Sequence, residues 1–153
     1  MSAYLLLQTL HTLSSTALCG LGAGSAYYAL RAWRTGNVEV IAATFKHLVF
    51  ADWAFTATTA VLQPLSGIGL MHLAGWSLQQ SWLQWTFGLY VLAGICWLPV
   101  VWIQMRVKRR LAETGGPDIP GDVHRLMRIW FALGWPAFAA LIAIVWLMIT
   151  KPG

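Results

Sequence analysis

Residues 53–105 carry no Asp, Glu, Lys or Arg and read WAFTATTAVLQPLSGIGLMHLAGWSLQQSWLQWTFGLYVLAGICWLPVVWIQM. A helix needs about 20 apolar residues to cross the hydrocarbon layer of a bilayer, so a run of this length holds two crossings. The rest of the chain has the same character, because 58% of its 153 residues are hydrophobic and only 10% are charged. Soluble domains carry about 25% charged residues, which excludes an ordinary globular protein. The sequence predicts a small integral membrane protein.

Two more uncharged runs flank this stretch. Residues 1–30 and 129–150 also lack Asp, Glu, Lys and Arg, and each is long enough for one crossing. We therefore predict a single all-α membrane domain over residues 1–153, folded as an up-and-down four-helix bundle with helices at about 3–33, 38–74, 80–108 and 122–150. Pro64 and Pro136 are expected to kink their helices, because proline removes a backbone donor. Asp122 is expected to cap the last helix.

The basic residues are distributed unevenly over the predicted loops. Ten Lys and Arg residues stand against five acidic ones, a balance that by itself could indicate nucleic-acid binding. Nine of the ten, however, flank the first and third loops: Arg31, Arg34, Lys46, Arg106, Lys108, Arg109, Arg110, Arg125 and Arg128. Membrane proteins keep such loops in the cytoplasm. We therefore expect both termini outside, contacts with anionic lipid headgroups, and no nucleic-acid partner.

His11 is the strongest candidate for chemistry in the first helix. It is expected on the order of 10 Å below the outer surface. At helical spacing it shares a face with polar and small residues that should point into the bundle: Gln8, Ser15, Leu18 and Gly22. An ionisable group inside the membrane is costly and therefore suggests a function. Two interpretations remain, a neutral histidine hydrogen-bonded to a neighbouring helix and an axial ligand of haem in a four-helix bundle.

A second polar stripe lies on the second helix. Its residues are spaced by four, three and four positions and so share a face: Asp52, Thr56, Thr59 and Gln63, continued by Ser66 and Gly67. Thr and Gln side chains often hydrogen-bond across helices simply to hold a bundle together. A carboxylate at this depth must be paired or protonated. Asp52 is therefore expected either to act in a proton path, to orient His47 or His11, or to pair with a basic residue from the set Lys46, Arg34 and Arg128.

The other histidines are weaker candidates. His47 and His124 lie near the cytoplasmic boundary beside basic residues, where they could form an inner site or simply face solvent. His72 is expected in the same leaflet as His11, but it lies about 200° around the helix from Asp52. We therefore expect His72 to face lipid headgroups unless a bend at Pro64 turns it inward.

Four short segments carry a resemblance to known membrane proteins: Leu10-His11, Ala51-Asp52-Trp53, Gln63-Pro64-Leu65 and WLPVVW at 97–102. With these segments, the whole chain resembles an uncharacterised family of four-helix bacterial membrane proteins, one of the domains of unknown function. Its layout is also similar to that of HemJ, the membrane protoporphyrinogen oxidase, and of CopD-like copper-resistance domains. His11 matches the haem-linked histidine of the HemJ-like pattern, and Pro64 followed by Gly67 or Gly69 matches its proline and glycine.

The resemblance implies a haem b-binding protein of the bacterial inner membrane, with oxidoreductase activity in porphyrin or electron-transfer chemistry. His11 would be the axial ligand, with His72, Gln63 or an open position opposite. Thr86 stands where the HemJ-like pattern has a lysine, and Leu133-Gly134 replaces its Asn-Glu pair. The haem ligand is therefore implied more strongly than the HemJ reaction itself.

Two other classes of function are consistent with the sequence. One is a small transporter, for copper or a proton-coupled solute, with Asp52, Thr56 and Thr59 along its path. Four methionines are scattered over the helices rather than forming a ladder, which disfavours copper: Met71, Met105, Met127 and Met148. The other is a non-catalytic accessory subunit that packs into a larger membrane complex. A homodimer that packs through the glycine or tryptophan faces is compatible with each of these classes of function.

Overall fold

A computed structural model describes residues 2–152, which fold into helices joined by short connections. The elements are α1 (Ala3–Thr35), α2 (Val38–Ala51), the π-helical turn η1 (Asp52–Thr56), α3 (Ala57–Ala74), α4 (Ser81–Thr114) and α5 (Gly121–Thr150). Because α2, η1 and α3 follow one another without a break, they form one continuous rod over residues 38–74, which we call the second rod. The predicted all-α class is confirmed.

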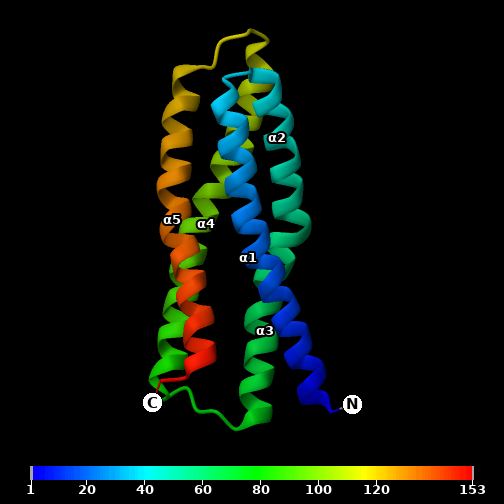
Figure 1. The fold of residues 1–153 in the computed structure, drawn as a ribbon, viewed down its shortest axis with the longest axis vertical. Helices are drawn as coiled ribbons and strands as arrows, with labels where there is room; N and C mark the ends of the chain where they lie inside the picture. Colours follow the sequence, from blue (N-terminus) through cyan, green and yellow to red (C-terminus); the bar gives the residue numbers. More distant parts are fainter. Residues whose placement is uncertain (1, 153) are drawn as a thin grey trace.

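The helices run alternately up and down, as Figure 1 shows. Both chain termini and the connection 75–80 lie at one end of the bundle, which we call the termini end. The turns 36–37 and 115–120 lie at the other end, which we call the basic end. Short connections between antiparallel neighbours produce this topology. The predicted up-and-down four-helix bundle is confirmed.

Two helix boundaries differ from the predictions. α4 continues to Thr114 instead of ending near residue 108, since Arg109 and Glu113 form an ion pair at i,i+4 spacing (3.6 Å). The helix then ends at Gly115, whose φ of 57° is the left-handed conformation that glycine adopts readily. α5 begins at Gly121, so Asp122 lies in its first turn and is not its cap.

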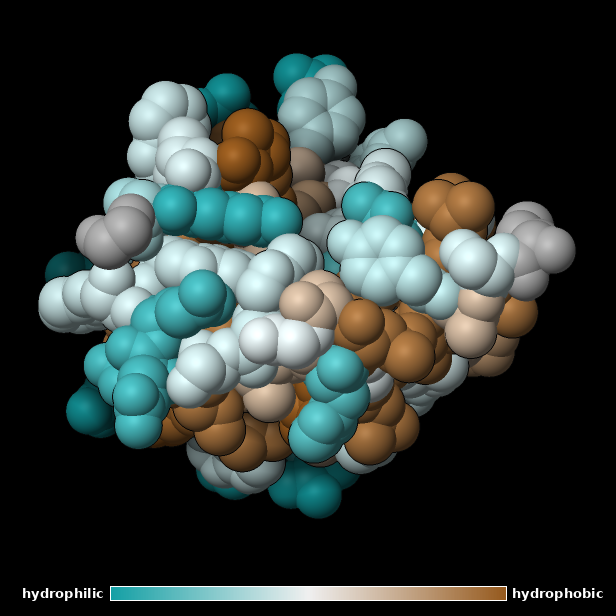
Figure 2. Space-filling model, turned by 90° about the horizontal axis from the view of Figure 1, so that it is seen from below, coloured by the Kyte–Doolittle hydropathy of each residue, from teal (hydrophilic) through white to brown (hydrophobic). Residues whose placement is uncertain are grey.

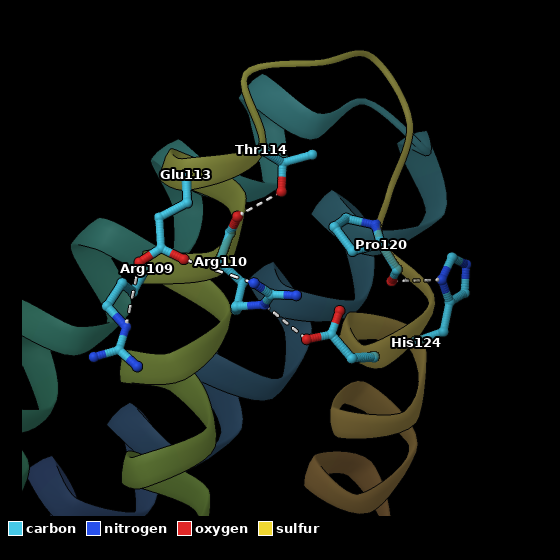
Figure 3. A network of polar contacts seen from close by, with 7 residues as sticks. Arg109, Arg110, Glu113, Thr114, Pro120 and His124 are labelled. Atoms are coloured by element: carbon cyan, nitrogen blue, oxygen red, sulfur yellow. Dashed lines mark hydrogen bonds and ion pairs between the residues drawn. The ribbon is translucent and has the colours of Figure 1, made fainter.

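Asp122 instead connects α5 to α4, through Arg110, which is labelled in Figure 3. Its Oδ2 accepts a hydrogen bond from Arg110 Nε at 2.7 Å, and Arg110 also lies 3.7 Å from Glu113. The hydrogen bond from the Arg110 guanidinium lowers the pKa of Asp122 below its ordinary value. These side chains are at the solvated basic end, beyond the apolar part of the bundle, so the pair orients the connection rather than the core.

Large apolar side chains cover much of the outside of the bundle. Trp135 is 76% exposed and Ile149 is 74% exposed, and Phe50 and Trp85 are similar. Figure 2 shows the termini end, where apolar residues lie among polar ones. Apolar surface of this extent suits lipid rather than water. By length and composition, α4 and α5 could each span a membrane. The other two predicted crossings, α1 and the second rod, carry the polar side chains described below.

Two apolar clusters lie at different heights in the bundle. The larger lies towards the basic end and consists of Ala29, Ala32, Ile41, Phe45, Leu48, Val100, Ile103, Val107, Leu111, Val123, Met127 and Trp130. The smaller lies at the termini end and consists of Met71, Trp82 and Leu83. The buried polar residues of the second rod lie between Leu48 of the larger cluster and Met71 of the smaller one. They are Asp52, Thr56, Gln63 and Ser66.

The second rod contains an irregular turn before Pro64. The N–H of Ala57 bonds to the carbonyl of Asp52, five residues back, which makes the wider turn between α2 and α3 in Figure 1. Pro64 lies inside α3, which continues to Ala74, and the kink expected there stays a prediction. Single π turns inside α-helices occur frequently at functional sites.

Candidate functional site

His11 of α1 faces Ser66 of α3. The ring Nδ1 lies 2.7 Å from Ser66 Oγ. That hydroxyl lies 2.6 Å from the carbonyl oxygen of Leu62, to which it can only donate. The Ser66 hydroxyl can donate to this carbonyl while it accepts from His11 Nδ1, and in that arrangement Nδ1 carries the ring proton. A neutral ring of this tautomer has a bare Nε2, which is the form of imidazole that binds metals.

Gln63 ties the same two helices together. Its Nε2 donates to the backbone carbonyl of His11 (2.8 Å) and to Ser14 Oγ (2.6 Å). Ser14 Oγ in turn donates to the His11 carbonyl at 3.1 Å. Gln63, Ser14 and Ser66 are buried, so water does not compete with these bonds. We call His11, Ser14, Gln63 and Ser66 the α1–α3 network.

Two glycines of α3 allow α1 to approach closely. A Cβ on Gly67 would lie 3.4 Å from His11 Cε1, and a Cβ on Gly69 would lie 2.6 Å from Leu7 Cδ2. The imidazole ring therefore packs against a position that has no side chain. Small residues at helix contacts in membranes have this effect, because they let backbones come together.

The face of α1 that is buried differs in part from the predicted stripe. Gln8 and Gly22 are exposed, whereas Ser14 and Leu18 are buried. Ser14 was not predicted. The expected stripe instead contained Ser15, which lies four residues after His11, whereas Ser14 lies three residues after it. Both spacings fit a helix, and only the neighbouring α3 decides between them.

The structure does not bring the other histidines to His11. His72 is exposed at the termini end of α3, and His47 and His124 are exposed towards the basic end. The His124 ring packs edge-on against Trp33 with 5.1 Å between ring centroids. Gln63 does lie beside His11, but its amide nitrogen is committed to α1.

The residues around His11 do not form a site for a metal ion held by side chains alone. Within residues 2–152, no group of three or more His, Cys, Asp or Glu side chains could hold a metal ion.

Asp52, Thr56 and Gln104 form a second buried polar group. Asp52 Oδ1 accepts a hydrogen bond from Thr56 Oγ1 at 2.9 Å, and the Gln104 side chain of α4 reaches the same carboxyl. Asp52 is 5% exposed and Gln104 is 1% exposed.

The structure does not show the predicted alternative of an ion pair for Asp52. The three ion pairs among residues 2–152 all lie at the basic end and involve Arg109, Arg110, Glu113 and Asp122. Lys46, Arg34 and Arg128, which were candidates for the pairing, do not reach the carboxyl. The aspartate follows Leu48 along the buried face of the second rod, where the larger apolar cluster begins.

One residue of the polar stripe, Thr59, and one residue of α4, Gln104, differ from expectation. Thr59 donates to the carbonyls of Phe55 (2.8 Å) and Thr56 (3.1 Å) in its own rod, so its hydroxyl is not directed towards Asp52. Gln104 was not predicted. The feature of the sequence that could have identified Gln104 is its position, because it is a single amide on the same helical face as the apolar Val100 and Val107.

Comparison with known proteins gives one match. A family profile described as "Predicted integral membrane protein (DUF2269)" matches residues 5–152. No curated protein and no solved structure matches the chain. The similarity to HemJ and to CopD-like domains therefore remains a prediction from the sequence.

Proposed function

The chain belongs to the DUF2269 family of predicted integral membrane proteins, and we propose that it binds haem b in the bacterial inner membrane, with His11 as the axial ligand. The observation that carries this proposal is the 2.7 Å contact between His11 Nδ1 and Ser66 Oγ, because a proton on Nδ1 would leave Nε2 free to bind iron. Histidines that bind metals commonly donate their second ring N–H in this way, which fixes the tautomer and the ring orientation.

The surroundings of His11 leave two choices for the other residue that would hold the haem. His72 is exposed and is not directed towards His11. Gln63 lies beside His11, and because its amide nitrogen donates to α1, its Oε1 is the atom that would contact the iron, unless that position stays open. When bound, the haem would supply a redox-active iron for porphyrin or electron-transfer chemistry. The protein's part is to hold His11 neutral, oriented and screened from water by the α1–α3 network.

The test is the visible absorption spectrum of the protein, purified in detergent from cells with full haem supply. We expect a Soret band of the b type with about one haem per chain. His11→Ala should lose the band, and the matched variant His124→Ala, which removes an exposed histidine, should keep it. Circular dichroism of both variants checks that helicity is retained.

Two results would overturn the proposal. One is wild-type protein without a Soret band at full haem supply, which would favour the transporter or accessory-subunit classes. The other is a His11→Ala variant with full haem content while His47→Ala or His124→Ala loses it, which would place the ligand at the basic end.

We also propose that the termini end faces outward and the basic end faces the cytoplasm. The proposal rests on the nine basic residues at or near the basic end, which is the side that membrane proteins keep inside. Single cysteines at Ser77 and at Gly116 would be labelled on intact cells with a membrane-impermeant maleimide. Ser77→Cys should react at once, and Gly116→Cys should react only after lysis. The reverse order would show that the orientation is inverted.

A further inference from the structure

Two buried oxygen atoms near the middle of the second rod lack a hydrogen-bond partner. They are Asp52 Oδ2 and Gln104 Oε1. Each side chain is more than nine-tenths buried, and the two approach each other where η1 meets α4. Buried polar groups in folded proteins are hydrogen-bonded in the great majority of cases. Two unpaired acceptors in adjoining side chains therefore indicate a hydrogen that lies between them.

An ionised Asp52 would have no compensating charge. Among residues 2–152, no Lys, Arg or His forms an ion pair with it. On the elements packed around η1, the titratable or charged groups nearest along the chain are Lys46 and His47 on α2, Cys19 on α1, His72 on α3, and Tyr90, Cys96 and Arg106 on α4. Its carboxyl accepts a hydrogen bond from Thr56 and contacts the uncharged amide of Gln104, and neither group supplies a compensating charge. An isolated carboxylate in an apolar interior is so costly that the group takes up a proton instead.

The amide of Gln104 offers an acceptor for that proton. The oxygen and nitrogen of a glutamine amide have nearly the same shape, so either can face Asp52. With the nitrogen facing Asp52, the carboxylate keeps its charge and Gln104 Oε1 stays unpaired. With Oε1 facing Asp52, a proton on Oδ2 makes one hydrogen bond that satisfies both oxygens and removes the charge. The bond from Thr56 to Oδ1 is unaffected.

We propose that Asp52 is a proton-binding site of the bundle, in which the protonated acid donates from Oδ2 to Gln104 Oε1. Release of the proton leaves a carboxylate against Gln104, so protonation is coupled to the contact between the second rod and α4. The π turn that begins at Asp52 is the irregular segment of this rod and lies at the same contact. The site is separate from His11, and its test does not depend on haem.

The test is infrared difference spectroscopy of the full-length protein in lipid at neutral pH. Wild type minus Asp52→Asn should show the carbonyl stretch of a protonated carboxylic acid, and heavy water should lower its frequency. Gln104→Leu removes the acceptor and should raise the frequency of the same band. Asp122→Asn is the matched control, because Asp122 is exposed and paired with Arg110. It should change only bands of ionised carboxylate.

A second measurement covers the case in which Asp52→Asn does not fold. Protein labelled with carbon-13 aspartate contains three labelled side chains, Asp52, Asp118 and Asp122, of which the last two are exposed. We expect one isotope-shifted acid band in the unmutated protein at neutral pH. A spectrum with carboxylate bands alone would overturn the proposal. Carboxylate bands that respond to sodium ions would also overturn it, because they would assign the site to a cation.

Discussion

At the scale of single residues, the contact between Ser66 Oγ and His11 Nδ1 is the one on which the account of the ring proton rests. Ser66→Ala removes the acceptor and leaves Nδ1–H without a partner between α1 and α3. Hydrogen bonds between membrane helices are worth about 0.6 kcal/mol on average and up to about 1.7 kcal/mol. Since Ser66 is buried, we expect a loss of about 1 kcal/mol in the free energy of unfolding, measured by denaturant titration in mixed micelles, and weaker haem retention.

Ser15→Ala is the matched control for this substitution. Ser15 is half-buried on the same turn of α1 and lies outside the α1–α3 network. The control should change the free energy of unfolding by much less than Ser66→Ala and should leave haem content unchanged. Equal effects of the two variants would show that the Ser66 hydroxyl has no special role.

Single residues could be predicted from the sequence where they are conspicuous. His11 and Asp52 stand out because ionisable side chains inside apolar runs are rare. Ser14 and Gln104 do not, because an uncharged polar side chain can serve simply to hydrogen-bond two helices together, and either face of α1 could have been the buried one. Their roles depend on contacts with residues about 50 positions away, such as Ser14 with Gln63.

At the scale of helices, the sequence predicts the ends that glycine determines. The turn at Gly36 and the end of α3 before Gly75 lie where expected, and both glycines adopt positive φ. The end of α4 could not be predicted from apolarity, because a helix does not stop where the membrane stops. It continues through solvated residues until Gly115.

The π turn was not predictable from local sequence. Residues 52–56, DWAFT, contain neither Gly nor Pro, and the sequence instead placed the irregularity at Pro64. A π turn depends on how the two halves of a helix pack against different neighbours. Here η1 contacts α1, and the carboxyl of Asp52, its first residue, also reaches Gln104 of α4. The helix that follows, α3, packs chiefly on α1.

At the scale of the whole molecule, charge-free runs and short connections determine the up-and-down bundle, and the sequence predicts it correctly. The position of the polar network depends on how the helices pack together and cannot be derived from any one helix. It lies between the two apolar clusters, so the ends of the helices are held by packing and the centre by hydrogen bonds. This arrangement places the His11 ring against Ser66 and Gly67, between the two clusters.

The most direct test of His11 as a haem ligand is nitrogen-15 magnetic resonance of histidine-labelled protein in lipid bilayers, before and after haem is added. The His11 signals are identified by their absence from His11→Ala. Without haem, we predict a proton on Nδ1 and none on Nε2. With haem, the Nε2 signal of His11 should shift or broaden, while those of the three exposed histidines should not. A His11 ring protonated on Nε2, or one unchanged by haem, would contradict the assignment.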